Sequence, residues 1–161
     1  MIALRCVIFM NVRRIISFWK RGVPPRMTRL TNCSKTPHLG GDPAECIRLG
    51  LFDGHGAIQG VCEQSFGYPN PDSSYLGLLI LSPKLRGSGY GPILFERMKN
   101  TAIENNCSEL FVAVLAPNTR GRAFWERIGF TFELSSDPIT TGVATHVRHR
   151  LRLDLNSDQK Q

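Results

Sequence analysis

The sequence predicts an α/β fold, in which a mixed and mostly antiparallel sheet is joined to helices within one domain spanning residues 1–161. Three observations support this prediction. A strand, an amphipathic helix and a second apolar strand follow one another over residues 75–115, which indicates a right-handed crossover between parallel strands. Residues 45–66 have the pattern of a hairpin. Residues 143–154 alternate apolar and charged side chains, as an antiparallel strand with one solvated face does.

The bulk composition indicates a globular domain rather than a membrane protein or a zinc-binding protein. The chain has 161 residues, of which 42% are hydrophobic, and this suits a globular domain with its own core. No apolar run approaches the roughly 20 residues that span a bilayer, so no membrane partner is expected. The five cysteines are odd in number and lack the spacing of a zinc site, which predicts reduced thiols, a cytoplasmic location and no metal.

The N-terminal region, residues 1–44, is basic and hard to interpret. Residues 2–10 favour a strand and residues 12–19 a helix, whereas residues 23–45 have the composition of a loop. The net charge of +7 is concentrated before Asp42, the first acidic residue. An acid-free basic start is also typical of a transit peptide, but the helix-stop signals argue against one. We interpret these basic residues as keeping the protein soluble rather than as binding nucleic acid, since few aromatic residues are interleaved with them.

The middle of the chain predicts two strands, at 45–53 and 57–66, joined by the turn Asp53-Gly54-His55-Gly56. Residues 67–74 form a further turn, and the apolar run 75–81 follows as a strand buried on both faces.

A glycine-rich loop, Arg86-Gly87-Ser88-Gly89-Tyr90-Gly91, separates that strand from a helix that has Pro92 at its first position. The helix has an apolar stripe, namely Leu94, Phe95, Met98 and Ala102, and ends near Asn105. Such a loop leaves backbone N–H groups unpaired at the positive end of the helix dipole, and a diphosphate can bind there. The glycines permit backbone conformations and close ligand approach that a Cβ would obstruct.

The last third predicts a strand at 109–115 and a short helix at 121–128, closed by Gly129. Two final strands, at 130–134 and 143–154, precede a frayed tail at 156–161. The strand at 143–154 could pair across a homodimer.

Two separated motifs together resemble the GNAT superfamily of acetyl-CoA-dependent N-acyltransferases. They are the loop at 86–91 and the segment with Asn118, then Phe124-Trp125, then Gly129-Phe130. The resemblance covers residues 45–153. It implies a sheet whose parallel strands, 75–81 and 109–115, splay apart at one end, with helices on both faces. It also implies acetyl-CoA as the co-substrate.

The resemblance assigns cofactor contacts residue by residue. Pantetheine would hydrogen-bond to the backbone of Leu79 and Leu81 and to Asn118, and Phe124 and Trp125 would wall the thioester. The diphosphate would bind at Arg86, Gly87, Ser88, Gly89, Tyr90 and Gly91. Ordinary structural roles are also open: a solvated side chain for Arg86, a helix N-cap for Asn118, and core packing for Phe124 and Trp125.

The chain departs from the family pattern at two positions that handle protons. Trp125 replaces a common tyrosine acid, and its indole N–H cannot serve in that way. Gly77 replaces a frequent glutamate base. We expect Glu63 to act as the base instead. Other candidates are Asp53, His55, Asp72, Tyr75 and Tyr90, and the thiolate could also take its proton from water.

The sequence therefore predicts an N-acetyltransferase that moves acetyl directly from acetyl-CoA to a primary amine, with the Leu81 N–H polarising the carbonyl. The acceptor could be a small molecule, a peptide N-terminus or a lysine. The basic residues within 11–45 slightly favour an anionic acceptor. The alternative function is a catalytically weak CoA-binding sensor or interaction module, which the missing tyrosine and glutamate suggest.

Overall fold

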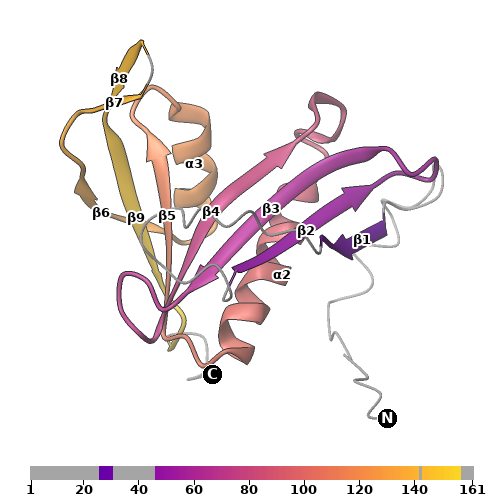
Figure 1. Ribbon diagram of the computed structural model, residues 1–161, viewed down its shortest axis with the longest axis horizontal. Helices are drawn as coiled ribbons and strands as arrows, with labels where there is room; N and C mark the ends of the chain where they lie inside the picture. The colour runs from indigo at the N-terminus through magenta and orange to yellow at the C-terminus, as the bar shows by residue number, and fades with distance from the viewer. Residues whose placement is uncertain (1–25, 31–45, 142, 157–161) are drawn as a thin grey trace.

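The computed structural model of the protein describes residues 26–30, 46–141 and 143–156, drawn in colour in Figure 1. The expected strand at 2–10, the expected helix at 12–19 and the tail at 157–161 lie outside the described residues. Seven strands form one sheet in the order β1-β2-β3-β4-β5-β9-β6, and β7 and β8 form a separate two-stranded ribbon.

The main sheet consists of β1 (Arg26–Arg29), β2 (Cys46–Phe52), β3 (Ile58–Phe66), β4 (Ser73–Leu81), β5 (Glu109–Leu115), β6 (Thr131–Ser135) and β9 (Arg148–Asp154). The ribbon consists of β7 (Ile139–Thr141) and β8 (Ala144–His146). The helical elements are the 3₁₀ turn η2 (Pro83–Leu85), the 15-residue helix α2 (Tyr90–Glu104) and α3 (Thr119–Arg127).

The predicted parallel pair is confirmed, and it separates part-way along. Strands β4 and β5 are the one parallel pair in the described sheet, and they pair only between residues 73–76 and 109–112. Figure 1 shows the two strands together at their amino ends and diverging toward their carboxyl ends. Beyond this point β4 stays paired to β3, and β5 stays paired to β9. We call the diverging part, residues 77–81 and 113–115, the fork.

A bulge at Gly77 lies where the fork begins. Leu76 pairs with Gln64 of β3 and Leu78 pairs with Glu63, so Gly77 is an extra residue on β4. A bulge bends its strand and increases the local twist. Because the β4–β5 ladder ends at Leu76, the bend coincides with the separation of the two strands.

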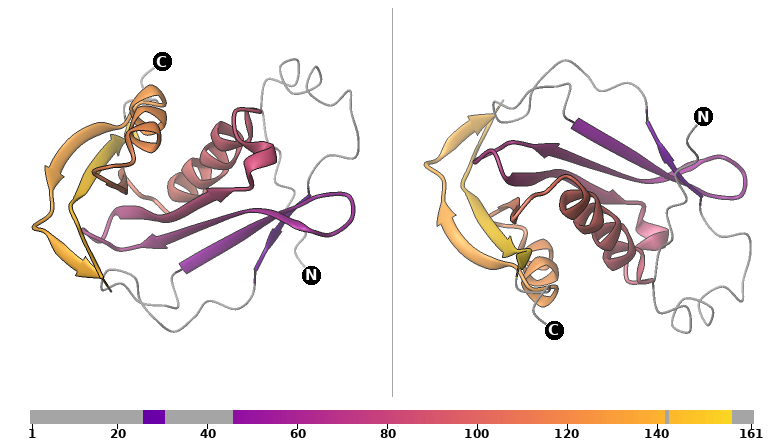
Figure 2. Two further views of the ribbon diagram at one scale, coloured as in Figure 1. Left: turned by 90° about the horizontal axis from the view of Figure 1, so that it is seen from above. Right: turned by 90° about the horizontal axis from the view of Figure 1, so that it is seen from below.

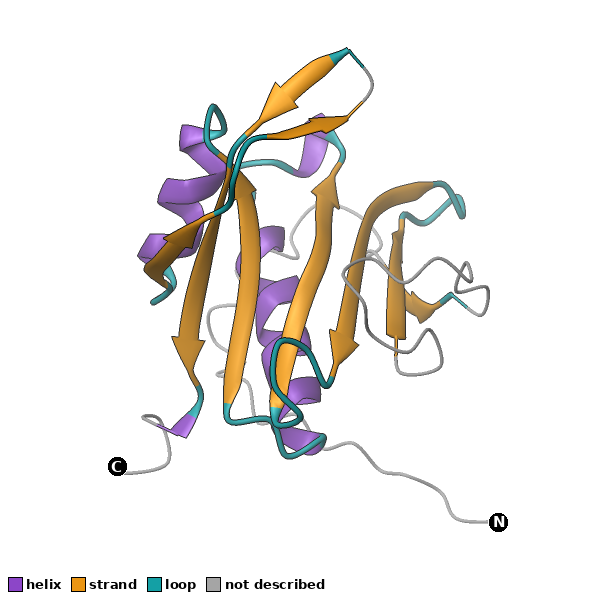
Figure 3. Ribbon diagram, turned by 60° about the vertical axis from the view of Figure 1, so that its left-hand side comes forward, coloured by secondary structure: helices purple, strands orange, loops and turns teal. Residues whose placement is uncertain are grey.

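The core lies between the sheet and the two described α-helices. The predicted stripe of α2 is buried, and Leu94, Met98 and Ala102 are at most 1% exposed. Trp125 of α3 packs edge-on against Phe95 of α2, with ring centroids 6.1 Å apart. Both helices therefore cover the same face of the sheet, and Figures 2 and 3 show them on one side of it. We call the opposite face, which carries Glu63, Tyr75 and Phe111, the far face. The resemblance implied helices on both faces, and the described helices lie on one face only; the predicted helix at 12–19 lies outside the described residues.

Two strand predictions are wrong. Residues 26–29, expected to be loop, form β1 along the edge of β2. Residues 143–154, expected to be one strand, are divided at Val147 into β8, which pairs with β7, and β9, which pairs with β5 and β6. The neighbouring strand β7 was not predicted.

The proposed pairing of residues 143–154 across a homodimer is also corrected. Strand β9 pairs with β5 on one side and with β6 on the other, so its backbone has no free edge. The edges of the described sheet are β1 and β6. No helix among the described residues is long and apolar enough to cross a membrane.

Candidate active site

The main-chain groups of Leu79 and Leu81 face into the fork. The Ser82 N–H donates to the carbonyl of Gln59, toward β3, at 2.8 Å. Since N–H and C=O groups alternate sides along a strand, Ile80 also faces β3, and Leu79 and Leu81 face the side of β5. The β5 ladder has ended by this point, so β5 does not pair with these two residues. The fork therefore presents an edge of β4 to an extended amide ligand.

Arg86 is tied to this edge. Its Nε donates a hydrogen bond of 3.0 Å to the carbonyl oxygen of Leu81, although its side chain lies at the surface. The interaction leaves the Leu81 N–H available and places a guanidinium charge next to the carboxyl end of β4.

The glycine loop joins the fork to the start of α2. Gly87 and Gly89 have φ values of +74° and +84°, which favour glycine, and Gly89 is the N-cap of α2. Within the described residues, neither amide donates a hydrogen bond, whereas the Ser88 N–H donates to Leu85 O at 3.3 Å. A Cβ at either glycine would meet no atom within 4 Å. Unpaired amides beside open space, at the positive end of a long helix, suit a phosphate.

Gly91 allows α3 to approach the loop. A Cβ at Gly91 would lie 3.1 Å from the Phe124 ring, which is closer than almost all real contacts. Phe124 is half-buried at this position, and the adjacent Tyr90 is also half-buried. The second motif is thus packed directly onto the first one, as the predicted site requires.

Asn118 and Trp125 have structural roles in the second motif. Asn118 is the N-cap of α3, and its Oδ1 accepts a hydrogen bond of 3.0 Å from Gly121 N. Trp125 is 7% exposed, and its ring lies 5.3 Å from that of Phe130 between centroids. The capping and packing roles left open by the sequence are therefore observed. Contact with a cofactor stays a prediction for both residues.

Glu63 lies on the far face, beside the bulge. It is 8% exposed and forms an ion pair with Arg48 of β2 through Oε2. Its other oxygen, Oε1, would be 3.5 Å from a Cβ placed on Gly77. No described donor binds Oε1. The carboxylate from β3 thus occupies the space next to position 77, where the family pattern has a glutamate on β4.

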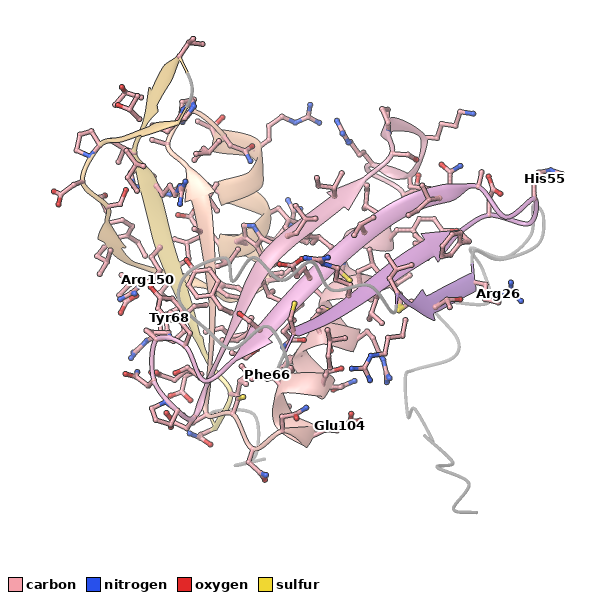
Figure 4. All side chains as sticks on the ribbon, viewed as in Figure 1. Arg26, His55, Phe66, Tyr68, Glu104 and Arg150 are labelled. Carbon is pink, nitrogen blue, oxygen red and sulfur yellow. The ribbon has the colours of Figure 1, made fainter. Side chains whose placement is uncertain are left out.

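The other proton-handling candidates lie in different surroundings. Asp53 closes the β2–β3 turn, and a hydrogen bond from the Ala57 backbone is the largest cause that lowers its pKa. His55 is at the tip of that turn in Figure 4. Asp72 hydrogen-bonds to Ser108 at the closed end of the β4–β5 pair. Glu63 is therefore the carboxylate among these candidates that lies at the bulge.

Tyr75 belongs to an aromatic group on the far face. It stacks on Phe111 with centroids 6.4 Å apart, and Arg150 lies 5.3 Å from the centre of the Phe111 ring. Burial raises the pKa of Tyr75 to about 12, although the charges of Arg150 and Arg148 oppose the rise. Its hydroxyl therefore stays protonated at neutral pH and is a hydrogen-bond donor rather than a base.

Sequence reasoning missed the arginines of this face. The alternation of Arg148, Arg150 and Arg152 indicated only a wet strand face, and nothing in the sequence paired Arg48 with Glu63. No group of His, Cys, Asp and Glu that could hold a metal is present in the described part of the chain.

Comparisons with known proteins agree on the fold. Residues 17–130 match the family model for acetyltransferases of the GNAT family. An IAA acetyltransferase structure from Bacillus cereus ATCC 14579 is 17% identical, covers 81% of this chain and 99% of its own, and has a TM-score of 0.62. The spermidine/spermine N-acetyltransferase SpeG from Vibrio cholerae, solved in complex with manganese ions, is 14% identical over 86% of this chain and 98% of its own, with a TM-score of 0.65. Nourseothricin acetyltransferase is 16% identical over 80% of this chain and 84% of its own, with a TM-score of 0.64. A comparison with curated proteins gave no match.

Proposed function

The chain belongs to the GNAT acetyltransferase family, and we propose that it transfers the acetyl group of acetyl-CoA directly to a primary amine. One observation carries the proposal: the fork of β4 and the unpaired amides of the glycine loop lie at the same end of the sheet. An extended pantetheine arm can hydrogen-bond to Leu79 and Leu81, while the diphosphate binds the amides of Gly87 and Gly89.

In the proposed reaction, the amine nitrogen attacks the thioester carbonyl carbon and the C–S bond breaks. The Leu81 N–H donates to the carbonyl oxygen as negative charge develops there. The amine proton passes to Oε1 of Glu63, directly or through one water, and the CoA thiolate takes a proton from solvent. The Arg48 ion pair holds Oε2 and so orients the carboxylate.

Acetyl-CoA binding and turnover test this proposal separately. Acetyl-CoA should raise the Tm, since a ligand that binds only the folded state stabilises it. Free thiol should appear when a panel of small amines and peptides is added. If no amine in the panel gives thiol above background while acetyl-CoA still raises the Tm, the alternative of a CoA-binding sensor is correct.

A carboxylate exchange tests the role of Glu63. Glu63→Gln should lower kcat by about 10²–10⁴-fold, which is typical for loss of a general base. The acetyl-CoA shift in Tm should persist, because Glu63 is outside the loop. Adding Gly77→Glu to this variant should restore part of kcat, because a side chain at 77 would start 3.5 Å from the position of Oε1. An unchanged kcat in Glu63→Gln would refute the assignment.

We also propose a cytoplasmic location, supported by the free, buried thiols of Cys62 and Cys107. A homodimer stays a prediction. If copies pair, the edge strand β6 offers exposed apolar side chains, since Phe132 is 49% and Leu134 is 41% exposed.

A further inference from the structure

Arg148 differs from the other arginines of the far face, because its guanidinium has no acidic partner among the described residues. Arg150 pairs with Glu133, Arg152 pairs with Glu109, and Arg48 pairs with Glu63. In the described structure, by contrast, no hydrogen bond or ion pair holds the Arg148 guanidinium, although the residue is half-buried. A half-buried arginine without an acceptor is poorly satisfied, and it can bind an anion at little cost in desolvation.

Arg148 lies at the mouth of the fork. It pairs with Leu115, the last residue of β5, whereas the β4–β5 ladder ends at Val112. Three residues of strand place it roughly 10 Å beyond that point. Leu151 of the same strand is in the core, so Arg148 and Arg150 belong to the opposite, far face. This is the face on which Glu63 lies.

Ser136, which follows β6, holds the backbone of Arg148 through two hydrogen bonds. The Arg148 N–H donates to the Ser136 hydroxyl at 3.1 Å, and the Arg148 carbonyl accepts from Ser136 N at 2.8 Å. These bonds fix the point of the strand from which the Arg148 side chain extends, and the guanidinium itself stays available to a ligand.

The surface between Glu63 and Arg148 is apolar and exposed. Leu78 and Ile80 of β4 lie on the far face by their pairing with Glu63 and Val61, and they are 36% and 52% exposed. Leu115, opposite Arg148, is 42% exposed. On this face Glu63, Glu109 and Glu133 each pair with an arginine, and Asp154 lies opposite Glu109 at the closed end of the β4–β5 pair. Among the described residues, Arg148 therefore leaves a positive charge without an acidic partner at the mouth of the fork.

We infer that the acceptor is a primary amine that also carries an anionic group, a carboxylate or a phosphate, and that Arg148 binds this group. The inference rests on the proposed function and names the substrate class of the same site. The amine would reach the thioester near Glu63, while the anion binds at the fork mouth. A polycationic amine would meet the unpaired guanidinium of Arg148, and at the described fork mouth it would find no second carboxylate besides Glu63 to bind its additional positive charge. Polyamines, the acceptors in the name of the SpeG protein, should therefore be poor acceptors here.

A matched series of amines tests the inference. The series is γ-aminobutyrate, its neutral amide, putrescine and 2-aminoethyl phosphate, each assayed by thiol release with saturating acetyl-CoA. We expect kcat/KM to be highest for the anionic amines. In Arg148→Gln, KM for these should rise on the order of tenfold to hundredfold, as for loss of a charged hydrogen bond. The KM of the neutral amide should not change.

Arg152→Gln is the matched control, because Arg152 is on the same strand and face but lies at the closed end, paired with Glu109. Its KM values should equal those of the wild type. Acidic and amide versions of one tripeptide, assayed in parallel, distinguish a peptide terminus from a free small amine.

Binding is measured beside turnover, so that the two proposals can fail separately. Calorimetry should show γ-aminobutyrate binding to the CoA-saturated protein and weaker binding to Arg148→Gln. Efficient turnover of putrescine over γ-aminobutyrate would overturn the inference and leave the proposed function standing, as would equal KM values in wild type and Arg148→Gln. If the wild type neither binds acetyl-CoA nor turns over any amine, the proposed function itself is overturned.

Discussion

Replacement of Gly89 by leucine should abolish acetyl-CoA binding without unfolding the protein. Gly89 has a φ of +84°, and an L-residue in this region costs about 1–2 kcal/mol. No neighbouring atom lies within 4 Å of its Cβ position, so steric clash within the protein adds nothing. The space that the leucine would fill is the space we assign to the diphosphate.

The expected shifts follow from these values. A loss of about 1–2 kcal/mol lowers the Tm of a chain of this size by roughly 2–8 °C. Acetyl-CoA at a hundred times its Kd adds about 2.7 kcal/mol to the wild type, a rise of roughly 5–11 °C. If Gly89→Leu weakens binding a hundredfold, the same concentration adds only about 0.4 kcal/mol, a rise of roughly 1–2 °C.

Gly56→Leu is the matched control in this thermal-shift assay. Gly56 has a φ of +80° and equally open surroundings, but it lies in the β2–β3 turn, on the side of β4 away from the fork. Both variants should lose similar stability, and only Gly89→Leu should lose the response to acetyl-CoA. A full response in Gly89→Leu, or the same loss in both variants, would refute the assignment of the loop.

Three further predictions concern the second motif and the core. Asn118→Ala should lower the Tm by roughly 2–4 °C, because it removes the N-cap of α3, which is worth about 1 kcal/mol. Asn118→Asp should retain the cap, and an equal loss of Tm in the two variants would contradict the capping role. Trp125→Ala should cost about 3–5 kcal/mol by chemical denaturation, because it empties a buried site against Phe95, and a loss below about 1 kcal/mol would exclude that role. Burial raises the pKa of Cys62 from 9.0 to about 11, so the folded protein holds this proton more tightly than the unfolded chain does. The contribution of this thiol to the free energy of unfolding is complete below pH 9 and is lost as the pH rises to 11. Cys62→Ala should therefore reduce the slope of the free energy of unfolding against pH in this range. An unchanged slope would contradict the assignment to Cys62.

Local patterns predicted the elements that lie at the centre of the sheet. Residues 109–115 form β5 with the predicted limits, because an apolar run between a turn and Pro117 leaves little choice of boundary. The apolar stripe of α2 is buried as expected, since its spacing matches one face of a helix. The parallel pairing of β4 and β5 followed from the helix between them, which must return the chain in the same direction.

Features that depend on strand register could not be predicted in this way. The ion pair of Arg48 with Glu63 exists because the two residues are opposite one another on β2 and β3, 15 positions apart in the chain. The break at Val147 separates residues 144–146, which pair with β7, from residues 148–154, which pair with β5. Arg148 acquires its place at the fork only through its pairing with Leu115. A periodic pattern assigns a residue to a face, but not to a partner on another strand.

The glycine at position 77 connects the shape of the site to its proposed chemistry. As the bulged residue it accompanies the bend that ends the β4–β5 ladder, so it helps to open the fork. Having no side chain, it also leaves the space next to Oε1 of Glu63 unfilled. A glutamate at position 77 would compete with Glu63 for this space, and the two carboxylates would repel each other. Under the proposed mechanism, a glycine at position 77 is compatible with a base supplied from β3, whereas a glutamate there is not. That arrangement also involves Arg48 of β2, which forms an ion pair with the mostly buried carboxylate of Glu63 and so compensates for its burial. In the proposed mechanism, Gly77, Glu63 and Arg48 thus form one unit, and a base supplied from β4 by Gly77→Glu requires that Glu63 be replaced as well.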